Sequence, residues 1–193
     1  MAGGNRMNYF AEIEPYFETL KKTVDQVDKK EIQKAMEILV KARDEKKYIF
    51  IMGNGGSAAT ASHYAGDFNK GLSLNRNKRF RFVALNDNAP TVLSLANDVS
   101  YDSIFVEQLK NFLDEGDIVI AISGSGNSKN IINAVEYAKQ KGNTVIGMTG
   151  YSGGKLKELS DIQLHVPLDN MQVVEDVHMV FCHLMTSILY KEQ

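Results

Sequence analysis

Histidine and carboxylate side chains recur in this sequence at spacings that suit acid–base or metal chemistry. His63 and Asp67 are four residues apart, so they would share one face of a helix. Near the C-terminus, Glu175, His178 and His183 interrupt a segment that is otherwise apolar. A single histidine on such a segment is usually a core residue, whereas two histidines together with carboxylates favour a functional site.

The separation of Glu175 and His183 limits how they can share a ligand. They are eight residues apart, which corresponds to a rise of about 12 Å along a helix. One copy of the helix can hardly place both side chains around a single ion. If both belong to one site, that site draws on two copies of the chain.

Two polar loops precede helical segments and suit the binding of an anion. The first is Gly53-Asn54-Gly55-Gly56-Ser57, where glycines allow close backbone approach and the new helix offers free N–H groups. The second contains Ser123, Ser125 and Ser128. Serine hydroxyls and N–H groups at a helix start bind phosphate without lysine or arginine. Together the loops predict a site for a small phosphorylated molecule.

The apolar pattern predicts the scaffold that positions these residues. Short apolar segments alternate with helical ones, which is typical of a parallel sheet covered on both faces. The expected strands are Tyr48–Met52, Phe80–Leu85, Asp117–Ile122, Thr144–Met148 and Ile162–Val166, the last of which contains His165, read as structural. The expected helices are two leading segments separated near Asp28, then Ala58–Asn69, Thr91–Ala96, Tyr101–Leu113, Asn130–Lys141, Lys155–Leu159 and Met171–Tyr190. The fold class is therefore α/β, with a doubly wound five-stranded parallel sheet whose ligands bind beyond the carboxyl ends of the strands.

Composition excludes several classes of protein. With 193 residues and 44% apolar content, the chain can bury a full core as one domain. The net charge of −2 argues against nucleic acid, and the basic segment from Lys70 to Arg81 reads first as a solvated loop and only second as a phosphate contact. A single cysteine, Cys182, excludes a disulfide framework and fits an inert core thiol. We find no signal peptide and no membrane span, so we expect a cytoplasmic protein with a disordered lead at Met1 to Arg6.

Two nucleotide-binding classes fit the sequence poorly. The chain lacks the Gly-x-x-x-x-Gly-Lys-Ser/Thr motif of P-loop NTPases. Gly53-x-Gly55-x-x-Ala58 matches a loose dinucleotide fingerprint, but His63 and Asp67 follow on a helix where a dinucleotide site needs nothing reactive.

Taken together, the motifs resemble the SIS (sugar isomerase) domain family and, within it, the sedoheptulose 7-phosphate or phosphoheptose isomerases. The resemblance covers nearly the whole chain. It rests on Gly-Asn-Gly-Gly-Ser at 53–57, His63 with an acid at 67, Ala-Asn-Asp at 96–98, Ile-Ser-x-Ser-Gly-Asn-Ser at 122–128, Thr149-Gly150 with Gly153-Gly154-Lys155, and the acidic and histidine-rich last helix.

The resemblance implies an organisation and an activity. It implies one SIS domain over 1–193, with N-terminal helices at 1–46 used in oligomerisation and an α/β core at 47–193. It implies a homotetramer with active sites at subunit interfaces. The implied reaction is an aldose–ketose isomerisation of sedoheptulose 7-phosphate to D-glycero-D-manno-heptose 7-phosphate through an enediol, supplying heptose precursors for surface glycans.

The resemblance also implies roles for particular residues. Asp67 and His183 would move the proton between C1 and C2 of the sugar. Zinc would be bound by His63, Asp67, Glu175 and His183. The sugar phosphate would contact Asn54, Gly55, Gly56, Ser57, Asn97, Asp98, Ser123, Gly124, Ser125, Ser128 and Glu175.

Four positions depart from the pattern of the family. Asp67 stands where the isomerases usually carry Glu and is one methylene shorter. Glu175 replaces a Gln, and its negative charge should tighten the binding of a divalent cation. Gly71 and Gly124 stand where the isomerases tend to carry an arginine and a threonine.

A non-catalytic SIS protein is the alternative. Such a protein would be a sugar-phosphate sensor or a replication-initiator-binding protein, and the segment at 53–59 resembles the initiator-binding branch as well. A sensor needs the serine loop but not His183. The joint presence of His63, Asp67, Glu175 and His183 favours the enzyme.

Overall fold

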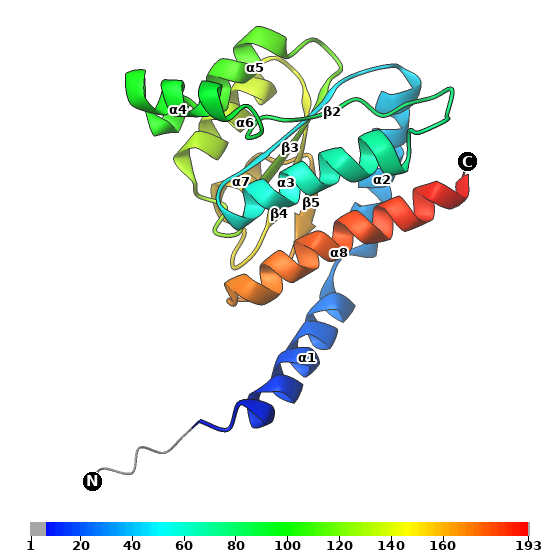
Figure 1. Ribbon diagram of the computed structural model, residues 1–193, viewed down its shortest axis with the longest axis vertical. Coiled ribbons are helices and arrows are strands. Elements are labelled where there is room, and N and C mark those ends of the chain that lie inside the picture. Colours follow the sequence, from blue (N-terminus) through cyan, green and yellow to red (C-terminus); the bar gives the residue numbers. More distant parts are fainter. Residues whose placement is uncertain (1–6, 193) are drawn as a thin grey trace.

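The central feature of the computed structural model, which describes residues 7–192, is a parallel sheet between two layers of helices (Figure 1). The strands are β1 (Ile49–Gly53), β2 (Phe82–Ala84), β3 (Ile118–Ser123), β4 (Thr144–Thr149) and β5 (Ile162–His165). All neighbours pair in parallel, in the order β2-β1-β3-β4-β5. The predicted five-stranded α/β class is confirmed.

Eight α-helices surround the sheet in the part of the chain that the structure describes. They are α1 (Tyr9–Gln26), α2 (Lys29–Asp44), α3 (Gly56–Gly66), α4 (Ala89–Asp98), α5 (Val106–Phe112), α6 (Lys129–Gln140), α7 (Gly154–Leu159) and α8 (Met171–Leu189). Asp28 separates the two leading helices as predicted, because its side chain accepts hydrogen bonds from the N–H groups of Lys30 and Glu31 at the start of α2.

Alternating side chains of the strands build a core on each face of the sheet. Ile49 and Ile51 of β1 belong to one buried cluster, which also contains residues of α2, α3 and α8. Phe50 and Met52 belong to a second cluster, with residues of α5, α6 and α7. Because both faces are covered, the strands are apolar throughout rather than alternating.

The prediction of one helix over Tyr101–Leu113 is wrong. Tyr101–Ser103 forms a short 3₁₀ turn, and α5 begins only at Val106. Ile104 and Phe105 are buried between the two, so the apolar spacing continues across the break and hides it. The predicted helix Ala58–Asn69 is α-helical only as far as Gly66, where α3 ends. The following residues, Asp67–Gly71, form a π-helical turn.

Helix α8 is a core helix, although by length and apolar composition alone the segment Met171–Glu192 would suffice to cross a membrane. Its residues Val173, Val177, Phe181 and Met185 are buried in the cluster that it shares with α2 and α3. Burial against the rest of the protein accounts for its composition.

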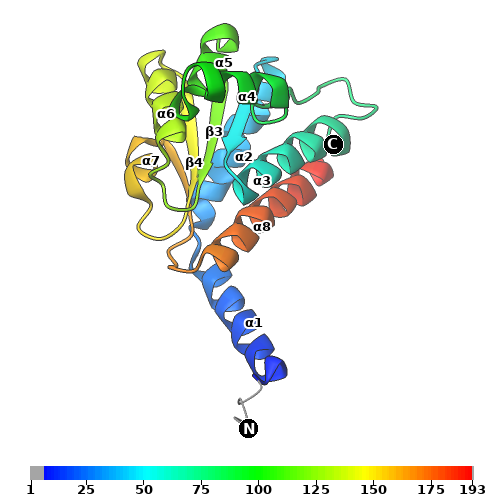
Figure 2. The same cartoon turned by 60° about the vertical axis from the view of Figure 1, so that its left-hand side comes forward.

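Helix α1 projects from the body of the molecule (Figures 1 and 2). It carries exposed apolar side chains, and so does the outer face of α8. These residues are Tyr9, Phe10, Ile13 and Phe17 on α1, and Val180, Leu184 and Ile188 on α8. The expectation of a disordered lead concerns Met1 to Arg6, which lie outside the described residues.

Candidate active site

The two polar loops lie at the carboxyl ends of neighbouring strands, as predicted. Gly55 turns from β1 into α3 with a φ of +53°, a conformation that favours glycine. In the loop after β3, Ser123 Oγ accepts a hydrogen bond from Gly126 N at 3.1 Å and lies 3.2 Å from Ser128 Oγ. The hydroxyls of Ser123 and Ser128 therefore face each other at the start of α6, whereas Ser125 Oγ accepts from the N–H of its own loop at Asn127.

A network of amides ties the first loop to the second. Asn54 and Asn130 exchange two side-chain hydrogen bonds, at 2.9 and 3.0 Å, and the Tyr101 hydroxyl donates to Asn54 Oδ1 at 2.8 Å. Asn130 is buried at the start of α6. These bonds fix Asn54 and leave the adjacent backbone of the glycine loop exposed.

Glu175 lies over the first turn of α3. A Cβ added to Gly56 would come within 2.7 Å of Glu175 Oε1. The carboxylate therefore fits here because Gly56 has no side chain. A carboxylate at a helix N-terminus is electrostatically favourable. Similarly, a Cβ at Gly124 would meet Met171 Sδ at 2.7 Å, so Met171 occupies the space beside this glycine.

A cluster of histidine and carboxylate side chains forms where α3 and α8 run side by side (Figures 1 and 2). His63 Nε2 lies 3.0 Å from His183 Nε2 and 3.3 Å from Asp67 Oδ2. The side chains of His63 and Asp67 are 44% and 38% exposed, so the cluster is open to a ligand. Cys182 Sγ donates to Asp67 Oδ2 from the core side at 3.9 Å.

The donor set of this cluster fits a metal ion. Ligand atoms of His63, Asp67 and Cys182 lie within 4.8 Å of one another. Imidazole and carboxylate are ligand types used by divalent transition metals, and Cys182 could join them only after its thiol loses a proton. Burial and the nearby Asp67 carboxylate raise the pKa of the Cys182 thiol to about 12, so at neutral pH the thiol is protonated and hydrogen-bonds to Asp67.

The other two histidines lie apart from this cluster. His178 is buried, and its Nε2 lies 3.2 Å from the carbonyl oxygen of Thr149. Burial lowers the pKa of His178 to about 4. His165 Nδ1 lies 2.9 Å from Thr149 Oγ1. Both histidines therefore connect β4 to its neighbours.

The structure unites part of the predicted site within one chain. His63, Asp67 and His183 come together, whereas Glu175 lies at the opposite end of α3, beside Gly56. Asn97 and Asp98 are exposed at the end of α4, and in the described part of the chain their one side-chain hydrogen bond joins them to each other.

Sequence reasoning missed Tyr101, Asn130 and the contact of Cys182 with Asp67. The position of Asn130, directly after the serine loop, could have indicated a role, because a polar side chain that is buried at such a place must form hydrogen bonds. The contact between Cys182 and Asp67 joins residues 115 positions apart in the sequence, so no local pattern could reveal it.

Comparison with known proteins agrees with this architecture. The SIS domain family matches residues 8–150. The chain is 40% identical to the phosphoheptose isomerase of Clostridium acetobutylicum over 84% of this chain and 82% of that protein. It is 35% identical to the phosphoheptose isomerase of Aliarcobacter butzleri, over 91% of this chain and 92% of that one.

A solved structure extends the similarity to three dimensions. The structure of a phosphoheptose isomerase from Francisella tularensis superimposes with a TM-score of 0.88 at 29% identity. The match covers 96% of this chain and the whole of that one. The chain therefore belongs to the SIS domain family, among the phosphoheptose isomerases.

Proposed function

We propose that this protein is a sugar-phosphate isomerase that converts sedoheptulose 7-phosphate to D-glycero-D-manno-heptose 7-phosphate. The observation that carries the proposal is the exposed group of His63, Asp67 and His183 between α3 and α8. The similarity to phosphoheptose isomerases over nearly the whole chain supports the substrate. A cytoplasmic location and a role in surface-glycan precursors remain predictions.

The serine loop would hold the phosphate of the substrate. Ser123 and Ser128 offer two hydroxyls at the start of α6, where backbone N–H groups and the helix dipole favour an anion. Asn54, Gly55, Gly56 and Ser57 would bind sugar hydroxyls from the neighbouring strand end. Asn97 and Asp98 would join them in the assembled protein.

Asp67 and His183 would carry the proton transfer. Both lie beside His63 Nε2, at 3.3 and 3.0 Å, so they face one small volume. One of them abstracts the proton on carbon while the other protonates oxygen, which gives an enediol, and the roles then reverse. A well-placed acid or base contributes about 10²–10⁴-fold to the rate.

The same cluster supports a proposal for zinc. His63, Asp67 and His183, which lie close together, would bind the ion together with Glu175. A bound zinc ion would act as a Lewis acid toward a substrate oxygen. Because Glu175 and His183 lie at opposite ends of their contact with α3, we infer that two copies of the chain complete each site, within a homotetramer.

Proton exchange in D₂O tests the function directly. Sedoheptulose 7-phosphate is incubated with the zinc-loaded protein and followed by NMR, before and after chelation. We expect deuterium at C1 or C2 and the appearance of the aldose, with loss of both on chelation and recovery with zinc. A folded, zinc-loaded protein that binds the sugar phosphate without exchange would instead be a sensor.

A pair of histidine variants assigns the chemistry. His183→Gln should reduce turnover by at least about 10²-fold, the contribution of one acid–base group. His165→Gln is the matched control, because His165 contacts Thr149 outside the cluster. Near-normal activity of His183→Gln would remove His183 from the reaction.

A further inference from the structure

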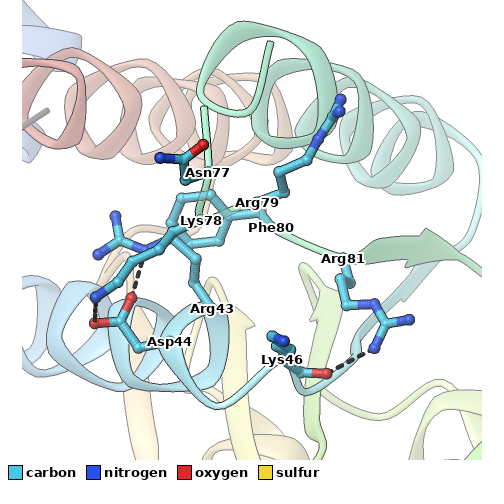
Figure 3. Close-up of a pocket in the computed structure, with 8 residues that line it drawn as sticks. All are labelled: Arg43, Asp44, Lys46, Asn77, Lys78, Arg79, Phe80 and Arg81. Carbon is cyan, nitrogen blue, oxygen red and sulfur yellow. Dashed lines mark hydrogen bonds and ion pairs between the residues drawn. The ribbon is translucent and has the colours of Figure 1, made fainter. Parts of the chain in front are cut away.

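A hollow of about 430 Å³ opens at the amino end of the sheet, away from the candidate active site (Figure 3). It lies between the end of α2, the turn that leads into β1, and the segment that leads into β2. Because Lys46 precedes β1 and Arg81 precedes β2, this is the opposite edge from the glycine and serine loops. Part of the basic segment noted in the sequence, residues 77–81, lines it.

The lining of this hollow is strongly positive. Of its eight residues, five are lysine or arginine and one, Asp44, is acidic, which gives a formal charge of +4. A smaller adjoining hollow of about 280 Å³ shares Arg43 and Lys78 and adds Arg76 and Glu192. In a chain whose net charge is −2, so much positive charge at one place attracts anions.

Arg43 is the most buried cation of the group. The residue is only 8% exposed; its Nε donates to Asp44 Oδ1 at 2.9 Å, and its guanidinium lies 5.4 Å from the centre of the Phe80 ring. Within residues 7–192, no partner is found for its two terminal nitrogens. A guanidinium held in this way presents a ready fork for two phosphate oxygens.

Lys78 lies on the Arg43 side of the hollow, Lys46 and Arg81 lie on the other, and the Arg79 side chain extends away from both (Figure 3). Lys78 Nζ binds the second oxygen of Asp44 at 2.7 Å, so both oxygens of the one acid are already used. Across the hollow, Arg81 donates to the carbonyl oxygen of Lys46 at 2.8 Å and to the Tyr48 hydroxyl at 3.1 Å, and the Lys46 ammonium has no partner among the described residues (Figure 3). Positive groups therefore stand on both sides with little internal neutralisation.

We propose that this hollow binds a small anion with two linked phosphate groups, such as the diphosphate of a nucleotide. Its volume lies within the range of about 300–1,000 Å³ that is usual for small-molecule sites. In this proposal one phosphate pairs with the Arg43 guanidinium and the second with the Lys46 ammonium, since both residues line the hollow. The two sites differ in how they would hold phosphate. The hollow is lined by cationic side chains, whereas the serine loop at the other edge of the sheet offers uncharged hydroxyls and backbone N–H groups.

Calorimetric titration of the zinc-loaded protein with ADP at low ionic strength tests the proposal. We expect one ADP per chain and weaker binding of AMP. The variant Lys46→Asn/Lys78→Gln should weaken ADP binding about tenfold or more, which corresponds to about 1.4 kcal/mol. Asn suits position 46 because the φ of that residue is +58°.

The control is Lys29→Gln/Lys30→Gln, which removes the same charge at the other end of α2, about 20 Å away by helix geometry. It should bind ADP like the wild type. The proposal is overturned if ADP gives no saturable binding, if AMP or inorganic phosphate binds as tightly, or if the control loses as much affinity. Tighter binding of a single-stranded oligonucleotide, lost in Lys46→Asn/Lys78→Gln, would also overturn it in favour of nucleic acid. None of these outcomes bears on isomerase activity, which the exchange assay measures separately.

Discussion

At the scale of single residues, burial decides which histidines can do chemistry. His63 and His183 are exposed beside Asp67, whereas His178 lies in the core and donates a hydrogen bond from Nε2 to the carbonyl oxygen of Thr149 in β4. Spacing along α8 could not separate His178 from His183, because both interrupt the same apolar segment. Their different environments follow from which side of the helix faces the sheet.

The buried imidazole of His178 should make stability depend on pH. Its pKa falls from 6.5 to about 4 on folding, so between these values the unfolded chain binds a proton that the native protein does not. Stability is therefore lost as the pH falls from 6.5 toward 4, by about 2 kcal/mol between pH 7 and pH 5. Urea unfolding at the two pH values measures this difference.

His178→Gln is the informative variant for this effect. It should be less stable than the wild type at pH 7, because a buried partner of Thr149 is changed, but its loss of stability between pH 7 and pH 5 should be smaller. His165→Gln provides the comparison on the other side of Thr149. An unchanged pH dependence in His178→Gln would mean that another group is responsible.

At the scale of elements, the structure packs the loop after β3 tightly against the loop after β4. Gly126 has a φ of +69°, and a Cβ added there would lie 1.9 Å from the carbonyl oxygen of Gly153. Leu156 N also donates to Gly126 O at 2.9 Å. The position of the serine hydroxyls therefore depends on close backbone contact that only glycine permits.

Replacing this glycine should damage both stability and substrate binding. Gly126→Ala forces overpacking against backbone, which costs about 1–3 kcal/mol beyond the strain of its φ. Gly142→Ala is a matched control, since its φ is +79° and nothing lies within 4 Å of the added Cβ. Urea unfolding and the KM for sedoheptulose 7-phosphate measure the two effects. Equal losses in both variants would show that backbone conformation alone is responsible.

The same scale shows how far sequence alone reaches. All five strands were predicted to within two residues, because a buried parallel strand leaves a continuous apolar segment such as Thr144–Met148. The His63–Asp67 pair was found because helical spacing is local. Sequence alone did not predict the break before Val106, because the buried turn there keeps the apolar spacing. It also did not predict the contact of Cys182 with Asp67, because a contact between residues 115 positions apart depends on packing.

At the scale of the whole molecule, the arrangement of α1 and α8 points to assembly. Tyr16 of α1 donates to Asp176 of α8 at 2.5 Å, which ties the projecting helix to the core. Both helices carry exposed apolar side chains, and Phe10 of α1 is 83% exposed. Helix α1 alone buries little, and an exposed apolar surface of this kind is typical of an interaction site, which the proposed homotetramer would cover.

Phe10→Glu/Ile13→Glu should disrupt this contact and lower the mass in solution, measured by light scattering after size exclusion. The physical reason is that burying carboxylates in an apolar interface is costly. Phe112→Glu is the control, because Phe112 is also exposed, at 58%, but lies at the end of α5 in the opposite part of the molecule (Figure 1). If Glu175 and His183 of different copies complete one site, isomerase activity should fall together with the mass in Phe10→Glu/Ile13→Glu and remain in Phe112→Glu. Full activity in a variant shown to be monomeric would mean that one chain holds a complete site, and the shared-site proposal would then be wrong.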